Sequence, residues 1–223
     1  MVVATNLEEI TNHIAEACER SNRKKEDISL IAVTKYVTIE RNKELVAAGI
    51  KDFGENRTEG FLEKYEAVGE GANWHFIGTL QSRKVKDIID KVDMIHSLDR
   101  ISLAKEINKR ATEPIDCFIQ VNVSEEETKH GLKVEEVEDF IKEIEKYDKV
   151  RVVGLMTMAP HVEDKELIRR VFRELATLRD TIRDKKYTHA PCHYLSMGMS
   201  NDYEIAIEEG ATHIRIGSKL VGE

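Results

Sequence analysis

The sequence contains few residues that crosslink or interrupt a chain. Only three of its 223 residues are cysteines (Cys18, Cys117 and Cys192), and no two of them form a CxxC pair. An odd number of widely spaced thiols argues against a disulfide framework and favours a reducing compartment. With three prolines and no Gly/Ser-rich stretch, the chain shows no linker, so we expect a single domain over residues 1–223.

Long apolar runs and an excess of basic charge are absent as well. No segment approaches the roughly 18 apolar residues of a membrane span, and residues 1–20 match neither a signal peptide nor a transit peptide. The 34 Lys and Arg residues against 42 Asp and Glu residues give a net charge of −8. Because nucleic-acid and lipid phosphates would be repelled on average, we expect a cytoplasmic protein that binds neither membranes nor nucleic acid.

What the sequence does contain is a strict alternation of two patterns. Short apolar runs rich in β-branched residues predict strands at 28–35, 50–56, 73–78, 93–98, 115–123, 150–158, 190–196 and 212–217. Helical periodicity and capping residues predict helices at 5–23, 38–48, 57–68, 80–91, 99–110, 133–147, 163–183 and 202–209.

Such βα alternation implies a parallel sheet with helical crossovers. Eight units in one chain of this length predict an α/β fold of the (β/α)₈ barrel type, with an additional helix at the N-terminus. An open doubly wound sheet is the alternative. Neither GxGxxG nor GxxxxGKS/T follows any predicted strand, so the nucleotide-binding forms of that open sheet have no support.

In a barrel of this kind the active site lies at the carboxyl ends of the strands. The string SMGMSN after the seventh strand contains Ser196 and Ser200, and the string IGSK after the eighth contains Gly217 and Ser218. Hydroxyls and backbone N–H groups in these two loops would suit a phosphate dianion. The alternative is ordinary turn chemistry, which favours the same residue types.

Lys35 directly follows the first strand, so it lies at the mouth of the barrel. A lysine that is partly desolvated there loses proton affinity and becomes an amine nucleophile suited to an aldehyde; alternatively, it only leaves the core toward solvent. Closure of the barrel would place strand one beside strand eight and Lys35 beside the phosphate loops. A ligand that carries both an aldehyde and a phosphate would fit.

Three further polar residues follow strands at the same end. Arg215 would point into the mouth and pair with a phosphate, a carboxylate or a ring nitrogen, or else form a structural ion pair. Asn56 and His75 would contact a ligand ring or only tie loops together. His189, Cys192 and His193 lack a second pair of ligands, so we expect no metal site.

Six strings in this order carry a family resemblance: IAVTKYV, GEN, WHFIGTLQ, GLMTMAP, LSMGMS and RIGS. They resemble the pyridoxal phosphate homeostasis proteins (the YggS/PROSC family), and the resemblance extends over about residues 6–222. It implies the fold of the N-terminal barrel of alanine racemase, fold type III among proteins that bind pyridoxal 5′-phosphate (PLP).

The resemblance also implies a role for each candidate residue. Lys35 matches the lysine that forms the internal aldimine, and Arg215 the arginine that faces the pyridine nitrogen. The phosphate would be contacted by Ser196, Ser200, Gly217 and Ser218, and the rest of the pocket lined by Asn56 and His75. Three positions depart from the family pattern: Arg83, Gly60 and Val221 stand where an asparagine, a glutamate and an aromatic residue are usual.

The resemblance favours a PLP carrier without a catalytic residue over an enzyme. An arginine at the ring nitrogen weakens the electron sink that PLP provides, and racemases with this barrel take a second base from an additional domain, for which the chain, ending at Glu223, leaves no room. A weak amino-acid racemase, a Schiff-base lyase and a cofactor-sensing module remain alternatives. Apo-enzymes that need PLP are candidate partners, and we expect a monomer.

Overall fold

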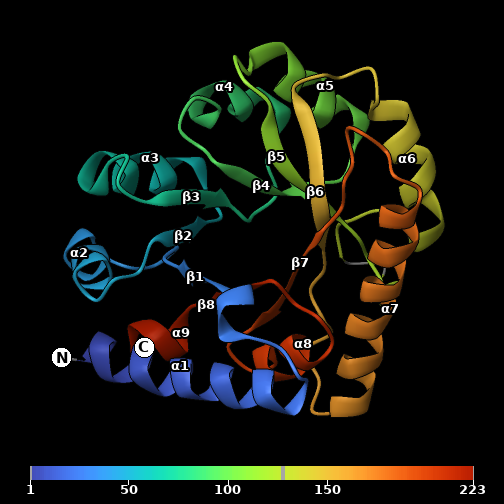
Figure 1. Ribbon diagram of the computed structural model, residues 1–223. Coiled ribbons are helices and arrows are strands. Elements are labelled where there is room, and N and C mark those ends of the chain that lie inside the picture. Colours follow the sequence, from blue (N-terminus) through green and yellow to red (C-terminus); the bar gives the residue numbers. More distant parts are fainter. Residues whose placement is uncertain (1, 127–128, 223) are drawn as a thin grey trace.

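A computed structural model describes residues 2–126 and 129–222, and it confirms the predicted barrel. Eight parallel strands are paired in sequence order, and β8 pairs with β1 to close the sheet (Figure 1). The strands are β1 (Ser29–Val33), β2 (Asp52–Glu55), β3 (Asn73–Phe76), β4 (Met94–Leu98), β5 (Ile115–Gln120), β6 (Val150–Met156), β7 (Tyr194–Met199) and β8 (His213–Ile216).

Helices surround the strands on all sides in Figure 1. They are α1 (Val2–Arg20), α2 (Ile39–Ala47), α3 (Thr58–Val68), α4 (Val85–Ile88), α5 (Ile101–Arg110), α6 (Val137–Ile144), α7 (Lys165–Asp184), α8 (Tyr203–Glu208) and α9 (Ser218–Val221). Short 3₁₀ turns precede β1, α4 and α6, at Lys25–Asp27, Ser82–Lys84 and Val134–Glu136. Among the described residues, no helix combines the length and the apolar composition that a membrane crossing requires.

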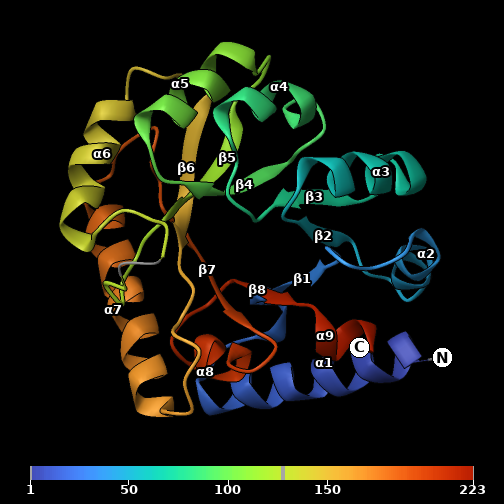
Figure 2. The ribbon, with the colours of Figure 1, turned by 180° about the vertical axis from the view of Figure 1, so that it is seen from behind.

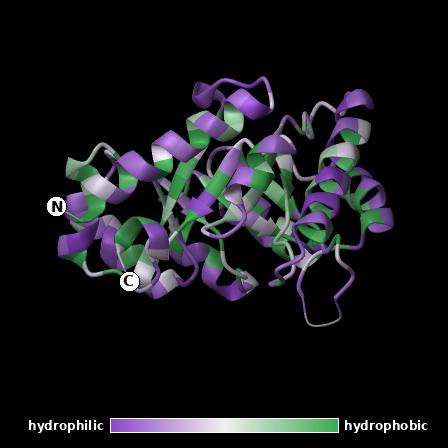
Figure 3. Ribbon diagram, turned by 90° about the horizontal axis from the view of Figure 1, so that it is seen from below, coloured by the Kyte–Doolittle hydropathy of each residue, from purple (hydrophilic) through white to green (hydrophobic). Residues whose placement is uncertain are grey.

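The apolar stripes of the helices explain how the outer layer packs. In α6 the predicted stripe of Val137, Phe140, Ile141 and Ile144 is buried, as expected for a helix that rests on a sheet. Hydrophobic residues gather on the strands and on the inner sides of the helices, and hydrophilic residues on the outer sides (Figure 3). The core therefore lies between the barrel and its helices.

The additional N-terminal helix covers one side of the barrel. Two views from opposite sides show α1 beside α8 and α9 (Figures 1 and 2). Its Ile10, Ile14 and Ala17 are buried, and Arg20 forms ion pairs with Glu204 and Glu208. The helix thus holds the segment that follows β7 and the end of the described chain against the barrel.

Some ends of strands and helices differ from the sequence prediction. The seventh strand was expected at 190–196 but runs over Tyr194–Met199, because Pro191 has no N–H for a ladder and Cys192 has φ +49°. The fifth helix is capped by Arg100 rather than Asp99, whose carboxylate accepts a hydrogen bond from Arg100 instead.

Candidate ligand site at the mouth of the barrel

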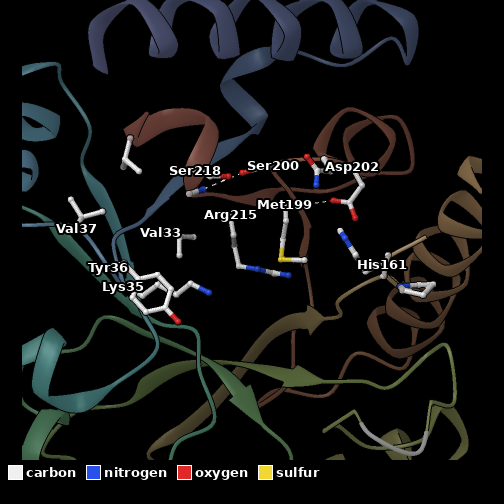
Figure 4. Close-up of a pocket in the computed structure, with 15 residues that line it drawn as sticks. Val33, Lys35, Tyr36, Val37, His161, Met199, Ser200, Asp202, Arg215 and Ser218 are labelled. Atoms are coloured by element: carbon white, nitrogen blue, oxygen red, sulfur yellow. Dashed lines mark hydrogen bonds between the residues drawn. The ribbon is translucent and has the colours of Figure 1, made fainter. Parts of the chain in front are cut away.

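A cavity of about 440 Å³ opens where the carboxyl ends of β1, β7 and β8 meet the segment that follows β6. Its polar lining comes from residues far apart in the sequence, drawn around one space in Figure 4: Lys35, Tyr36, His161, Ser200, Asn201, Asp202, Arg215 and Ser218. The pairing of β1 with β8 brings the first and the last of these together, as the sequence predicted.

Lys35 lies at one side of this cavity, and its amine points toward the centre (Figure 4). Its Nζ atom is 5.1 Å from the centroid of the Tyr36 ring, within the range of a cation–π interaction. From the sequence we expected partial desolvation of this lysine, with a side chain that leaves toward solvent as the alternative, and the structure shows an exposed side chain. The amine is therefore accessible to a small molecule entering from solvent.

The residue before Lys35 is held by a buried ion pair. Thr34 is fully buried, and its hydroxyl donates to Glu55 Oε1 over 2.5 Å. Lys64 Nζ lies 2.5 Å from the same carboxylate oxygen and also donates to the carbonyl oxygen of Thr34. Both charged side chains are almost completely buried, so they fix the peptide that carries Lys35.

Arg215 forms the floor of the cavity and is 4% exposed. Its Nη1 donates to Ser196 Oγ and its Nη2 to the carbonyl oxygen of Thr157 over 2.9 Å. Within residues 2–126 and 129–222, no carboxylate lies at ion-pair distance from it, so the structural ion pair considered from the sequence does not form there. Burial lowers the pKa of Arg215 to about 10, partly opposed by Asp202, so the guanidinium stays cationic at neutral pH.

The two predicted phosphate loops meet at another side of the cavity. The hydroxyl of Ser200 accepts a hydrogen bond from the backbone N–H of Gly217 over 3.4 Å, and Ser218 begins α9 beside it (Figure 4). Asp202 accepts from the N–H of Met199 over 2.6 Å and stabilises the turn between β7 and α8. Burial raises the pKa of this Asp202 carboxyl.

Three of the expected site residues lie outside the lining of this cavity. Ser196 is fully buried inside β7, because the strand continues three residues past it; its hydroxyl binds Arg215 and His96. His75 points into the barrel interior and contacts His96 and Asp52. Asn56 is half-buried, and its backbone packs closely against Gly78 after β3.

The comparisons with known proteins fit this geometry. Residues 5–223 match the family model of the alanine racemase N-terminal domain. The protein named pyridoxal phosphate homeostasis protein in Aquifex aeolicus (strain VF5) is 44% identical to this chain, and the match covers 100% of this chain and 99% of that protein. The protein of the same name in Escherichia coli (strain K12) is 34% identical over 99% of this chain and 96% of its own length.

This chain belongs to the pyridoxal phosphate homeostasis protein family. Among solved structures, PipY of Synechococcus elongatus PCC7942 with PLP bound has a TM-score of 0.82 at 28% identity, covering 94% of this chain and 100% of PipY. An alanine racemase of Clostridium difficile 630, in complex with cycloserine, has a TM-score of 0.79 at 18% identity and covers 99% of this chain but 59% of the racemase. That second likeness shows the shared barrel.

The three departures from the family pattern have different surroundings. Gly60 faces the buried ion pair: a Cβ atom there would lie 3.1 Å from Glu55 Oε2. Val221 lines the cavity. Arg83 is exposed and donates to the side chain of Gln81 over 2.9 Å, outside the lining. Two of the three substitutions therefore lie near the site or its support.

Proposed function

We propose that this protein binds PLP at the mouth of its barrel and takes part in vitamin B6 homeostasis as a carrier of the cofactor. The observation that carries the proposal is the meeting of three groups on one cavity: the amine of Lys35, the guanidinium of Arg215, and the hydroxyls of Ser200 and Ser218. The PLP-bound structure of PipY, a relative with the same barrel, supports it.

The donor set fits the chemistry of PLP. When bound, PLP supplies an aldehyde that condenses with an amine, and a pyridine ring that withdraws electrons. The accessible amine of Lys35 can react with the aldehyde. The buried guanidinium of Arg215 has N–H donors left for the ring nitrogen, and the hydroxyls and backbone N–H groups of the two loops can bind the phosphate. A cavity of about 440 Å³ falls in the size range of small-ligand sites.

We assign roles to this chain's residues on that basis. Lys35 Nζ attacks the aldehyde and holds the cofactor covalently, with loss of one water. Ser200, Ser218 and the backbone of Gly217 bind the phosphate. Arg215 donates to the ring nitrogen; because its pKa of about 10 keeps the guanidinium cationic at neutral pH, it disfavours protonation of that nitrogen.

The placement of Lys35 and Tyr36 argues against a racemase that would use this pair as its two bases. Racemisation with two bases needs one on each face of the substrate carbon. Lys35 and Tyr36 are neighbours after β1 and lie on the same side of the cavity (Figure 4). Deuterium exchange at the α-carbon of amino acids, faster than with free PLP, would instead favour a weak racemase.

The exposed rim supports delivery of PLP to other proteins. Tyr36 is 67% exposed and Met199 38% exposed beside the cavity, so its entrance faces solvent. We propose that a monomer hands PLP to apo-enzymes in the cytoplasm. Transfer to an apo-enzyme should then be faster than release of PLP into solution, which stopped-flow absorbance measures.

The proposed function is tested by the visible spectrum after incubation with PLP. We expect the wild-type protein to gain a band in the near-ultraviolet to blue range that survives gel filtration. Lys35→Ala should lose that band, because it removes the amine. Lys219→Ala is the matched control: this exposed lysine lies beside Ser218, and its loss should leave the band intact. A band retained by Lys35→Ala would contradict the assignment.

A further inference from the structure

A chain of hydrogen-bonded side chains runs through the barrel interior beneath Arg215. Arg215 donates to Ser196 Oγ. Ser196 Oγ lies 2.8 Å from His96 Nδ1, His96 Nε2 lies 2.9 Å from His75 Nδ1, and His75 Nε2 lies 3.0 Å from Asp52 Oδ1. The five residues come from β8, β7, β4, β3 and β2, so the chain depends on closure of the barrel.

This chain of hydrogen bonds joins the two ends of the barrel. Arg215 lines the cavity at the carboxyl ends of the strands. Asp52 is the first residue of β2, and with His75 it lines a second cavity of about 820 Å³ at the amino ends. The four residues from Arg215 to His75 are each less than 5% exposed, so the links between them are shielded from water.

One arrangement of protons satisfies every link and leaves no polar side-chain proton of Ser196, His96 or His75 without an acceptor. A guanidinium is a pure donor and a carboxylate a pure acceptor. The order is therefore fixed as Arg215 to Ser196 Oγ, Ser196 O–H to His96 Nδ1, His96 Nε2–H to His75 Nδ1, and His75 Nε2–H to Asp52. In this order every group between the two ends accepts once and donates once.

The reverse order leaves a proton without a partner. If His96 donated from Nδ1, Ser196 Oγ would accept from both Arg215 and His96, and its own proton would need a further acceptor. Among residues 2–126 and 129–222, the Ser196 hydroxyl has no other hydrogen-bond partner than these two. A buried hydroxyl proton without an acceptor is unfavourable, so the reverse order is disfavoured.

The surroundings agree with this assignment. Burial is the largest cause that holds the pKa of His96 well below 6.5, and the neighbouring His75, His213 and Arg215 add to it, so this ring is neutral. Burial raises the pKa of Asp52, but hydrogen bonds from His75 and Asn73 outweigh it, so the carboxyl is ionised. The chain therefore leads from a cation to an anion.

We propose that Ser196, His96 and His75 are positioning residues that hold the guanidinium of Arg215 toward the ring nitrogen of the cofactor. Arg215 has no carboxylate at ion-pair distance in the described part of the chain, and its rotamer is fixed by Ser196 and the carbonyl of Thr157. The role toward the cofactor rests on the proposed function; the order of protons does not. Ser196 then acts through Arg215 rather than on the phosphate.

The order of protons is tested on the whole protein without added PLP. Nitrogen-15 NMR distinguishes a protonated imidazole nitrogen from an unprotonated one. We expect both His96 and His75 to carry their proton on Nε2 and to leave Nδ1 unprotonated at neutral pH. A proton on Nδ1 of His96 would overturn the proposal, and this result does not depend on whether PLP binds.

The positioning role is tested with variants that remove single links. Ser196→Ala should weaken PLP binding roughly tenfold, about the value of one hydrogen bond to a charged group, and shift the absorption band of bound PLP. Ser97→Ala is the matched control, because this neighbouring buried hydroxyl has no hydrogen-bond partner in the part of the chain that the structure describes; it should leave both quantities unchanged.

A pair of substitutions at His96 separates positioning from packing. In His96→Asn the amide oxygen lies near the position of Nδ1 and can still accept from Ser196, whereas His96→Leu offers no acceptor and only fills space. We expect the Asn variant to keep the wild-type spectrum of bound PLP more closely than the Leu variant. The proposal fails if folded Ser196→Ala binds PLP like the wild type with an unshifted band. It also fails if both His96 variants keep the wild-type spectrum.

Discussion

The peptide that carries Lys35 is held in place by a buried ion pair. Glu55 and Lys64 form an ion pair of 2.5 Å with side chains 1% and 5% exposed. Together they bind the hydroxyl and the carbonyl of Thr34. In the interior, a charge left without its partner is far more costly than the loss of the whole pair.

This asymmetry gives a prediction for stability. Lys64→Met should lower the free energy of unfolding by about 3–5 kcal/mol, because Glu55 is left buried without its cation. The double variant with Glu55→Gln should cost less than Lys64→Met alone. Urea unfolding followed by circular dichroism measures both values. A Lys64→Met cost below about 1 kcal/mol would contradict a supporting role for the pair.

At the scale of single residues, the sequence predicted which residues follow the strands. It did not predict which side chains contact each other across the interior of the barrel. Lys35, Ser200 and Arg215 could be placed because each lies in a string at a strand end. The hydroxyl of Ser196 meets His96, which is 100 positions away in the sequence. That contact depends on the side chains of five strands in a closed barrel, and spacing along the chain carries no signal for it.

Among the elements, the extent of β7 decides where the proposed phosphate loop begins. The predicted strand at 190–196 would leave Ser196 at its end. The observed strand, Tyr194–Met199, places Ser196 in the interior and Ser200 at the mouth. The sequence pattern failed here because Ala190 and Cys192 are apolar and buried although they precede the strand. Apolarity alone does not separate a buried turn from a strand.

The tight packing of β7 on α8 can be tested at Gly198. This residue has φ +95°, and a Cβ atom would lie 2.6 Å from Ala206 Cβ. Gly198→Ala should therefore lower the free energy of unfolding by more than about 2 kcal/mol, and weaken PLP binding through Ser200, which lies two residues farther along.

Gly49→Ala is the control for the cost of placing a residue with a Cβ atom in a left-handed backbone conformation. Gly49 has φ +92°, but no atom of the described residues beyond its two chain neighbours lies within 4 Å of the added Cβ, so only the conformational cost of about 1–2 kcal/mol should remain. Chemical denaturation and PLP titration compare the two variants. Equal effects of the two substitutions on stability and binding would show that the β7–α8 contact does not matter.

For the molecule as a whole, the alternation of strands and helices was sufficient to predict the architecture. Apolar runs predicted the eight strands, and helical periodicity predicted the helices between them. The lengths were less predictable: the helix expected at 80–91 is a 3₁₀ turn followed by α4. Packing between neighbouring helices, which sequence periodicity does not encode, sets such ends.

The histidines inside the barrel predict how stability changes with pH. Burial, reinforced by the neighbouring His75, lowers the pKa of His213 to about 3, and that of His96 is also far below 6.5. Between these values and about 6.5 the unfolded chain binds protons that the folded protein does not, so the free energy of unfolding falls as the pH is lowered.

The size of this effect can be measured by urea unfolding. Going from about pH 7 to about pH 5.5 should cost about 2–3 kcal/mol, with each histidine contributing up to about 1.4 kcal/mol per pH unit. Carboxyl groups with ordinary pKa values stay ionised in this range. His213→Asn should show about half the loss, and equal stability of the wild type at both pH values would disagree with neutral histidines in the barrel.

The central claim is that the amine of Lys35 and the groups around Arg215 and Ser200 hold one PLP molecule at the mouth of the barrel. The most direct measurement is borohydride reduction of the protein incubated with PLP, followed by proteolysis and mass mapping of the peptides. The account predicts a single pyridoxyl group on Lys35. A pyridoxyl group on another lysine, or none on any peptide, would contradict it.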